Sequence, residues 1–182
     1  MSASSFYNQL EAQNQELPPV ELWNPPLSGE MDCVISRDGS WHIDGSELHN
    51  FRLQRLLSKV LKLEDGEYFL VSPVEKWRIE VEDHPFMIVE ITMIDAETEN
   101  QVLRVRNNIG DWQNIDETHS ISTSVISGLD EDVLVPFVVF RQGLGARFNR
   151  NSHLQLAEFL EVSDTDNEYL LSSSGHTFNL HF

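Results

Sequence analysis

Short stretches in which apolar and polar residues alternate dominate this chain, and this period of two predicts strands more often than helices. Turn residues such as those at 37–40 separate the stretches, which is the pattern of β-hairpins. A near-continuous apolar run at 86–94 predicts a central strand. The other predicted strands cover residues 31–36, 41–43, 68–72, 77–81, 101–106, 122–126, 133–141 and 146–148, one that begins at Trp112, and two that lead to the end of the chain.

Two stretches have the period of a helix instead. Residues 51–63 place their apolar side chains on one face and basic side chains on the other, and Gly66 is expected to cap the helix. Residues 153–160 predict a second helix. A short helix is also expected over residues 4–15, followed by a proline-rich arm that Trp23 should anchor on the core.

The chain resembles itself at a spacing of 101 residues, because residues 67–73 align with 168–174 and Trp77 then falls on Phe178. The expected fold class is therefore α+β. Two related modules, each a β-hairpin, a helix and a second hairpin, would be joined by a mostly antiparallel central sheet. The expected domains are an N-terminal helix and proline-rich arm at 1–30, a first module at 31–95, and the central strands with the second module at 96–182.

Composition limits the classes of function. The chain has 12 basic and 30 acidic residues, and its formal net charge of -18 repels nucleic acid polymers and anionic membranes. No apolar run is long enough to span a bilayer, and residues 1–5 lack the features of a signal peptide, so a cytoplasmic protein is expected. The single cysteine, Cys33, fits a reducing compartment and builds neither a disulfide framework nor a thiolate metal site.

No sequence motif indicates catalysis or a cofactor. The 7 histidines lack the close helical spacing of a metal site, so no metal is expected. There is no nucleophile elbow, and the run 143–148 begins like a dinucleotide loop but has Phe148 where the last glycine should be. Glu82 and Asp83 leave a hydrolase open as a minor alternative, although the alternation of Arg78, Glu80 and Glu82 is typical of a solvated strand face. An enzyme is therefore not expected.

The arginines are the most informative charged residues. Arg104 and Arg106 share one face of a predicted strand, and Arg141 belongs to a second group around a turn. Two interpretations stay open. The guanidiniums either pair with the many acids of the chain or form an anion-binding cluster where the modules meet. Trp77 or Trp112 would then stack on the planar part of a ligand.

Several short motifs resemble one bacterial family. They lie at residues 23–26, 37–39, 74–79, 81–86, 108–111, 141–144 and 149–150. Together they are specific, and from about residue 20 to residue 182 the chain resembles family 1285 of the domains of unknown function. The residue before Pro85 is usually small in that family and is His84 here, and the loop around Arg147 and Phe148 also differs.

The resemblance implies a duplicated α+β core whose C-terminal half is similar to a pleckstrin-homology barrel. It also implies a ligand site between the two halves, for a nucleotide-type ligand in a signalling role, and it implies no established activity. The residues that the resemblance places at this site are Lys76, Trp77, Arg106, Asn108, Asp111, Arg141 and Asn149.

The leading hypothesis is a cytoplasmic, non-catalytic ligand-sensing or regulatory protein that binds a small anionic molecule between its modules. Arg106 and Arg141 would neutralise the charge of the ligand, and an aromatic residue would stack on its planar part. The alternative is a protein–protein adaptor without a small-molecule ligand, which docks a partner or a second copy of the chain to form a homodimer. No cofactor is expected in either case.

Overall fold

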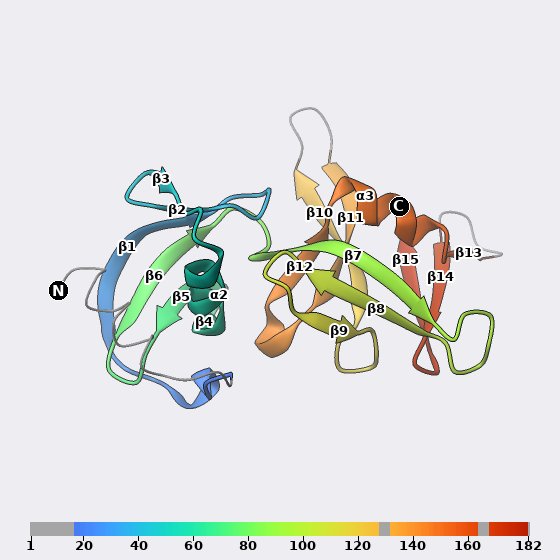
Figure 1. The fold of residues 1–182 in the computed structure, drawn as a ribbon, viewed down its shortest axis with the longest axis horizontal. Coiled ribbons are helices and arrows are strands. Elements are labelled where there is room, and N and C mark those ends of the chain that lie inside the picture. Colours follow the sequence, from blue (N-terminus) through green and yellow to red (C-terminus); the bar gives the residue numbers. More distant parts are fainter. Residues whose placement is uncertain (1–16, 128–131, 164–167, 182) are drawn as a thin grey trace. The chain divides into compact units, whose positions relative to one another are not determined.

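The computed structural model describes residues 17–127, 132–163 and 168–181, and the chain divides into two compact units, residues 1–83 and 84–182 (Figure 1). The predicted N-terminal helix and the turn at 164–167 lie outside the described residues. Among the described residues, no helix is both long enough and apolar enough to cross a membrane.

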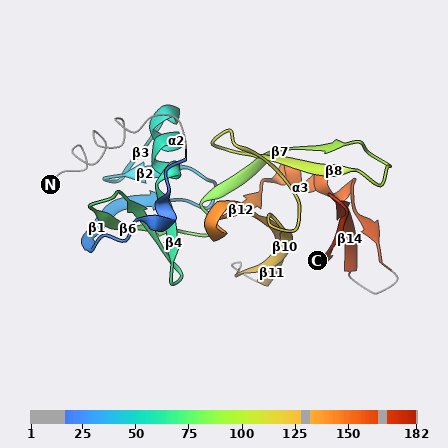
Figure 2. The same cartoon turned by 90° about the horizontal axis from the view of Figure 1, so that it is seen from below.

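The described residues of the first unit form one sheet. Its elements are η1 (Val20–Leu22), β1 (Leu27–Ile35), β2 (Trp41–Ile43), β3 (Ser46–Glu47), α2 (Phe51–Lys59), β4 (Leu61–Glu64), β5 (Glu67–Val71) and β6 (Lys76–Val81). The six strands lie in the order β3-β2-β1-β6-β5-β4, and neighbours are antiparallel except for the parallel pair β1 and β6. The helix α2 covers one face of this sheet (Figure 2).

The helix α2 ends earlier than the sequence predicts. It stops at Lys59, and Leu61 lies in β4, buried and paired with Leu70 of β5. Asp65 and Gly66 have φ angles of 52° and 83°, so they form the two-residue turn of the β4–β5 hairpin and Gly66 caps no helix. The prediction was wrong because the apolar spacing around Leu61 fits a helix and a strand equally, and the hairpin turn decides between them.

The proline-rich arm is anchored as predicted. Trp23 packs against a cluster formed by Val20, Phe69 and Val71. Its carbonyl oxygen also accepts a hydrogen bond from Nζ of Lys62 at 2.9 Å. The arm is therefore held on the core by an apolar contact and a polar one.

The second unit contains two sheets and one α-helix among its described residues. Its elements are β7 (Phe86–Ile94), β8 (Val102–Asn107), β9 (Trp112–Asn114), β10 (Ile121–Ser127), β11 (Asp132–Val139), η2 (Arg141–Gly143), β12 (Gly145–Phe148), α3 (Arg150–Ala157), β13 (Glu161–Val162), β14 (Glu168–Ser173) and β15 (His176–His181). The larger sheet has the order β10-β11-β12-β7-β8-β9, with β12 parallel to β7, and the smaller has the order β13-β14-β15.

The helix α3 packs beside β7 (Figures 1 and 2) and begins at Arg150, before the predicted start at residue 153. Asn149 caps the helix, because its Oδ1 accepts a hydrogen bond from the backbone N–H of Ser152 at 2.8 Å. The buried hydroxyl of Ser152 donates to the carbonyl oxygen of Ile88 at 2.8 Å. These bonds attach the start of α3 to the sheet.

The duplication predicted from the sequence extends to the strand register. Tyr68 pairs with Ile79 across β5 and β6, and Tyr169 pairs with Leu180 across β14 and β15, again 101 residues apart. Each unit also contains a six-stranded mixed sheet with one parallel pair of strands. The prediction of two related modules in an α+β fold is confirmed.

The two modules differ in the sheet to which the second hairpin belongs. In the first unit, β4, β5 and β6 continue the large sheet, whereas β13, β14 and β15 form a sheet of their own in the second unit. The strands predicted to join the modules, β7 to β9, belong to the large sheet of the second unit. That unit starts at residue 84, whereas the sequence places the module boundary after residue 95.

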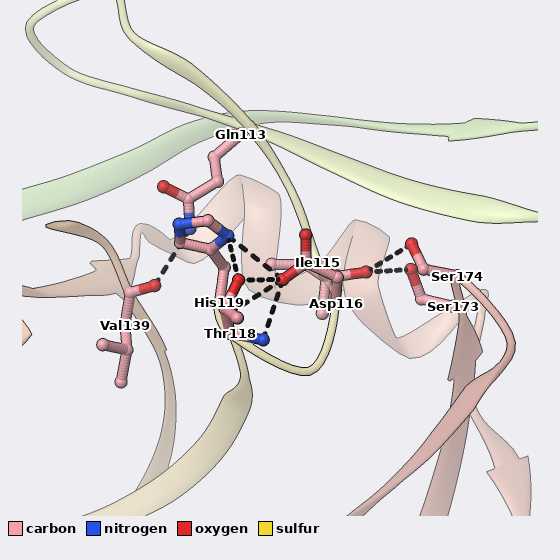
Figure 3. A network of polar contacts seen from close by, with 8 residues as sticks. All are labelled: Gln113, Ile115, Asp116, Thr118, His119, Val139, Ser173 and Ser174. Carbon is pink, nitrogen blue, oxygen red and sulfur yellow. Dashed lines mark hydrogen bonds and ion pairs between the residues drawn. The ribbon is translucent and has the colours of Figure 1, made fainter.

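Polar contacts connect the smaller sheet of the second unit to the larger one (Figure 3). The buried Oγ of Ser173 accepts from the backbone N–H of Leu103 at 2.9 Å and donates to the carbonyl oxygen of Ile115 at 2.7 Å. The hydroxyl of Ser174 donates to the same carbonyl at 2.8 Å. The turn between β14 and β15 is thereby fixed to the edge formed by β8 and the chain that follows β9.

Candidate functional site

Cationic and aromatic side chains gather on the outer face of β7, β8 and β9 in the second unit. Strand pairing arranges them in two rows, since residues directly opposite each other on antiparallel strands share a face. The first row is Glu90–Arg106–Trp112 and the second is Thr92–Arg104–Asn114. The opposite face of the same strands carries the buried core residues Ile91, Leu103 and Val105. We call the outer surface the arginine face, defined by Glu90, Thr92, Arg104, Arg106, Trp112 and Asn114.

The first row of the arginine face is electrostatically paired within itself. Nη2 of Arg106 lies 2.5 Å from Oε2 of Glu90, and Cζ of Arg106 lies 5.6 Å from the centroid of the Trp112 ring. The indole is 39% exposed, so it offers surface to a ligand even while it contacts the guanidinium. Arg106 is therefore a neutralised, well-supported part of the surface.

The side chains of the second row are polar, but none of them belongs to an ion pair within the described residues. Cζ of Arg104 lies 5.0 Å from the centroid of the Trp112 ring. Within the part of the chain that the structure describes, the side chains of Thr92, Arg104 and Asn114 make no hydrogen bond or ion pair. The row presents one guanidinium flanked by a hydroxyl and an amide, and these are groups that donate to an anion.

The turn between β8 and β9 sets the position of Trp112. The Oδ1 of buried Asn107 accepts from the backbone N–H groups of Ile109 at 3.2 Å and Asp111 at 2.9 Å. The backbone N–H of Asn107 also donates to the carbonyl oxygen of Asp111 at 3.0 Å. Gly110 has a φ of 90°, a conformation that suits glycine. The backbone N–H and the backbone carbonyl of Asp111, the residue before Trp112, are therefore both hydrogen-bonded to Asn107.

An ion pair supports the same turn from the side. Nη1 of Arg141 lies 3.5 Å from Oδ2 of Asp111, and Cζ of Arg141 lies 5.6 Å from the ring centroid of Phe86. Burial lowers the pKa of Arg141, and the charge and hydrogen bond of Asp111 act in the opposite direction. The Arg141 side chain is only 17% exposed, so its contacts are those of a supporting residue.

The structure brings part of the predicted site together. The predicted residues Asn108, Asp111, Arg141 and Asn149 gather around the first residues of β7. There Oδ1 of Asn108 accepts a hydrogen bond from the backbone N–H of Met87 at 3.1 Å. The backbone N–H of Asn149 donates to the carbonyl oxygen of Ile88 at 3.0 Å. Arg106 lies on the arginine face. These contacts give most of the group a role in holding the fold.

Lys76 and Trp77 lie in the first unit, on β6. Nζ of Lys76 lies 3.0 Å from Oε2 of Glu64, and the indole N–H of Trp77 donates to Oε2 of Glu75 at 3.3 Å. The other five predicted site residues belong to the second unit, and a ligand site shared by the two units stays a prediction from the sequence. Sequence reasoning missed Glu90, Thr92 and Asn114, whose positions next to the arginines depend on strand register.

The position that departs from the family pattern has a structural partner. His84 lies against Phe137, with ring centroids 5.0 Å apart. Its ring also occupies the space that a side chain at residue 145 would need, and that residue is Gly145. A side chain at residue 145 would clash with the His84 ring, so a glycine at this position leaves room for the imidazole.

Asp116, Thr118 and His119 contain the residue types of a catalytic triad, but not its geometry (Figure 3). Oδ1 of Asp116 accepts from Thr118 Oγ1 at 2.8 Å and lies 3.1 Å from Nδ1 of His119, and Thr118 Oγ1 lies 3.0 Å from that same nitrogen. A triad needs the base to contact the nucleophile and the acid through different nitrogens. Burial acts to raise the pKa of Asp116, but the bonds from Thr118 and His119 outweigh it and lower the pKa. The carboxylate therefore organises a loop.

Two further groups that could take part in chemistry, Cys33 and Glu82, have structural surroundings of their own. Cys33 is 1% exposed, and burial, followed by the charges of Asp32 and Asp44, raises its pKa to about 12. Oε2 of Glu82 accepts from the backbone N–H of Arg37 at 2.8 Å. No group of three or more His, Cys, Asp or Glu residues within the described ranges is arranged to hold a metal ion.

Comparisons with known proteins agree with the two-unit organisation. A model of the N-terminal domain of DUF1285, a domain of unknown function, matches residues 18–84, and a model of its C-terminal domain matches residues 85–180. A crystal structure of a DUF1285 family protein from Silicibacter pomeroyi DSS-3 is similar, with 34% identity and a TM-score of 0.86, over 95% of this chain and 92% of that one.

A second crystal structure, of a DUF1285 family protein from Shewanella baltica OS155, is similar over a smaller part of this chain. It has 26% identity and a TM-score of 0.54, and the alignment covers 70% of this chain and 91% of the other. No curated protein matches the sequence.

Proposed function

Because this chain belongs to DUF1285, a family of unknown function, we propose its function from the geometry of the candidate site. The protein is a non-catalytic ligand-sensing or regulatory protein, and it binds a small anionic molecule of nucleotide type. The arginine face is the binding surface. Arg106 is common to this surface and to the site that the sequence predicts.

The proposal depends on the surroundings of the Arg104 guanidinium. In a chain with a net charge of -18, this guanidinium lies beside a half-exposed indole and has no carboxylate partner among the described residues. Contact with Trp112 alone does not require this arrangement, because Arg106 contacts the same ring while paired to Glu90. An unpaired cation is what a surface needs in order to take up an anion.

The overall negative charge does not prevent such binding. Exposed charges are largely screened beyond about 8–10 Å at physiological ionic strength, so the nearest groups dominate the energy of a bound anion. A planar ring that stacks on an exposed aromatic side chain contributes about 1–3 kcal/mol. A charge-assisted hydrogen bond to Arg104 adds to this. Together these contributions support weak binding, with a dissociation constant on the order of 1 mM.

A thermal-shift screen followed by calorimetry tests the proposal. The panel contains nucleotides, nucleosides, aromatic carboxylates and inorganic phosphate, and the expected result is that some ringed anion raises the melting temperature by mass action. Arg104→Gln and Trp112→Ala should each weaken that binding at least tenfold.

Arg78→Gln is the matched control, because Arg78 is a strand arginine whose guanidinium is already paired with Glu30 and Glu67. It should leave binding unchanged. Arg141→Gln separates this proposal from a site centred on Arg141. If no panel member binds, or if Arg104→Gln binds as the native protein does, the proposal is wrong.

The adaptor alternative has one observation in its favour. Val125 and Leu134 are 59% and 37% exposed on the β10–β11 hairpin, and they are paired directly with each other, so they share one face. Exposed apolar side chains that lie together are typical of a protein contact. If the protein is an adaptor, a stoichiometric partner should co-purify with it and be lost from a Val125→Ser/Leu134→Ser double variant, while the arginine-face variants keep it.

A further inference from the structure

The anionic group that suits the arginine face follows from the charge and the donors of its second row, Thr92–Arg104–Asn114. We infer that the face recognises the terminal phosphoryl group of a phosphomonoester that also carries one flat ring, in preference to a phosphodiester of the same ring. The ring stacks on Trp112, and the phosphoryl group binds the second row. The inference rests on the proposed function and narrows its ligand class.

The charge of Arg104 is the first reason. Oε2 of Glu90 lies 2.5 Å from Nη2 of Arg106, so these two groups neutralise each other, whereas Arg104 has no ion pair within the described residues. The attraction between its guanidinium and an anion increases with the charge of the anion. A phosphomonoester carries close to two negative charges at neutral pH, because its second pKa is about 6, whereas a phosphodiester carries one. The phosphomonoester is therefore attracted more strongly.

The donors around Arg104 are the second reason, and they come from three adjacent strands. Thr92 on β7 and Asn114 on β9 lie directly opposite Arg104 on β8, so the Cβ atoms of neighbours in this row are about 4.5–5.5 Å apart. All three side chains are exposed, and within the described ranges none of them makes a hydrogen bond. They offer a hydroxyl, a guanidinium and an amide as donors. A phosphomonoester has three terminal oxygens that accept hydrogen bonds, so it uses all three donors at once.

The position of Trp112 sets the distance between the ring and the phosphoryl group. Trp112 is a diagonal neighbour of Arg104, because the residue directly opposite Arg104 is Asn114. Diagonal neighbours on an antiparallel pair lie about 7–8 Å apart. The ring and the phosphoryl group therefore need a short spacer between them, and the ribose of a nucleoside monophosphate is one.

The test compares two probes that share ring and sugar. Adenosine 5′-monophosphate has a terminal phosphoryl group, whereas its methyl ester is a phosphodiester with a single negative charge. Dissociation constants are measured on the full chain at pH 7.5 by NMR titration, which resolves millimolar binding. The monophosphate should bind about fivefold more tightly than the ester, as expected for one additional charge about 4 Å from a guanidinium in water.

A second arm changes the charge of the probe while the protein stays native. At pH 5.5 only about a quarter of the monophosphate is doubly charged, since its second pKa is about 6. Its affinity should therefore fall about two- to threefold relative to pH 7.5. The methyl ester keeps its charge over this range. It therefore reports any effect of pH on the protein itself, including on Glu90, Arg104 and Arg106, the charged groups of the face.

Variants of the second row identify where the phosphoryl group binds. Arg104→Gln should weaken the monophosphate more than the ester, so that the ratio of their affinities falls towards one. Thr92→Val and Asn114→Leu each remove a donor without changing the charge, and each should weaken the monophosphate at least about threefold. Thr177→Val is the matched control and should change neither affinity, because Thr177 is an exposed strand threonine on β15 of the smaller sheet. Circular dichroism spectra confirm that the variants are folded.

The outcomes separate the two proposals. If no ringed anion binds, the proposed function fails and this inference fails with it. If both probes bind equally and Arg104→Gln weakens both by the same factor, the proposed function stands and the preference for a phosphoryl group is wrong. A preference that survives Arg104→Gln, or an affinity for the monophosphate that Thr92→Val and Asn114→Leu both leave unchanged, places the phosphoryl group elsewhere and overturns the inference.

Discussion

Each unit has two cations beside one aromatic ring on a strand surface, and the two arrangements differ in how the cations are neutralised. On β6 of the first unit, Nζ of Lys76 lies 4.9 Å and Cζ of Arg78 lies 6.0 Å from the ring centroid of Phe69. Phe69 is only 5% exposed. Both cations have carboxylate partners, which are Glu64 for Lys76 and Glu30 and Glu67 for Arg78.

On the arginine face of the second unit, the ring is exposed and the pairing is incomplete. Trp112 is 39% exposed, Arg106 is paired with Glu90, and Arg104 has no ion pair in the described residues. Two cations and one aromatic ring thus form a closed structural cluster in the first unit and an open surface in the second. The comparison shows that an arginine beside an aromatic ring indicates a ligand site only when the carboxylates around it leave a cation unpaired.

The largest expected difference concerns the two rings. Phe69→Ala should lower the free energy of unfolding by about 3–5 kcal/mol, because it leaves a cavity in the core of the first unit. Trp112→Ala should lower it by about 1–2 kcal/mol, because the ring is 39% exposed and loses its contacts with Arg104 and Arg106, while it weakens ligand binding at least tenfold. Urea unfolding measures both variants, and equal losses of stability would show that Trp112 is a core residue.

A carboxylate placed next to Arg104 should convert the open surface into a closed one. Thr92→Glu puts an acid directly opposite Arg104, and it should weaken binding of a ringed anion by about tenfold or more, equivalent to about 1.4 kcal/mol. Thr92→Gln is the control of matched size without the charge, and it should bind within about twofold of the native protein. Calorimetry at low and at high salt checks the result. If Glu and Gln behave alike, the charge of Arg104 is not what binds the ligand.

The arginines themselves should have opposite effects in the two units. Arg78→Gln removes contacts with two carboxylates and should cost about 0.5–1 kcal/mol of stability, within the range of exposed ion pairs, with no effect on ligand binding. Arg104→Gln should change stability by less than about 0.5 kcal/mol. Thermal unfolding of both variants in one buffer gives the comparison, and a larger loss for Arg104→Gln would contradict it.

The smallest expected effect is a dependence on pH. The hydrogen bond from Lys76, opposed by burial and assisted by the charge of Lys62, lowers the pKa of Glu64 below its ordinary value of 4.5. A lowered folded-state pKa stabilises the protein above the unfolded pKa, and this stabilisation is lost as the pH falls through the folded value. Melting temperatures between pH 7 and pH 3 should therefore fall slightly less for Lys76→Met than for the native protein. Arg104→Met, which removes a cation without such a partner, should follow the native curve.

The local elements of this fold could be predicted from the sequence. Alternation of apolar and polar residues is a property of consecutive residues, and it located most strands, the shared face of Arg104 and Arg106, and the self-similarity that the matching register of β5–β6 and β14–β15 confirms. Turn chemistry was less well interpreted. Asp65 and Gly66 already have the residue types of a hairpin turn, yet the apolar spacing before them extended the predicted helix through Leu61.

The tertiary structure alone decided which charges meet. Glu90 and Arg106 are far enough apart in the chain that no local pattern pairs them, and a shift of one residue in the register of β7 and β8 would turn the facing side chains to opposite sides of the sheet. The same long-range pairing puts neutral Thr92 and Asn114 beside Arg104. The sequence by itself determined the elements and the kinds of charge they carry. Strand pairing determined which cation lacks a carboxylate partner among the described residues, because ion pairs here depend on contacts between residues that are distant in the chain.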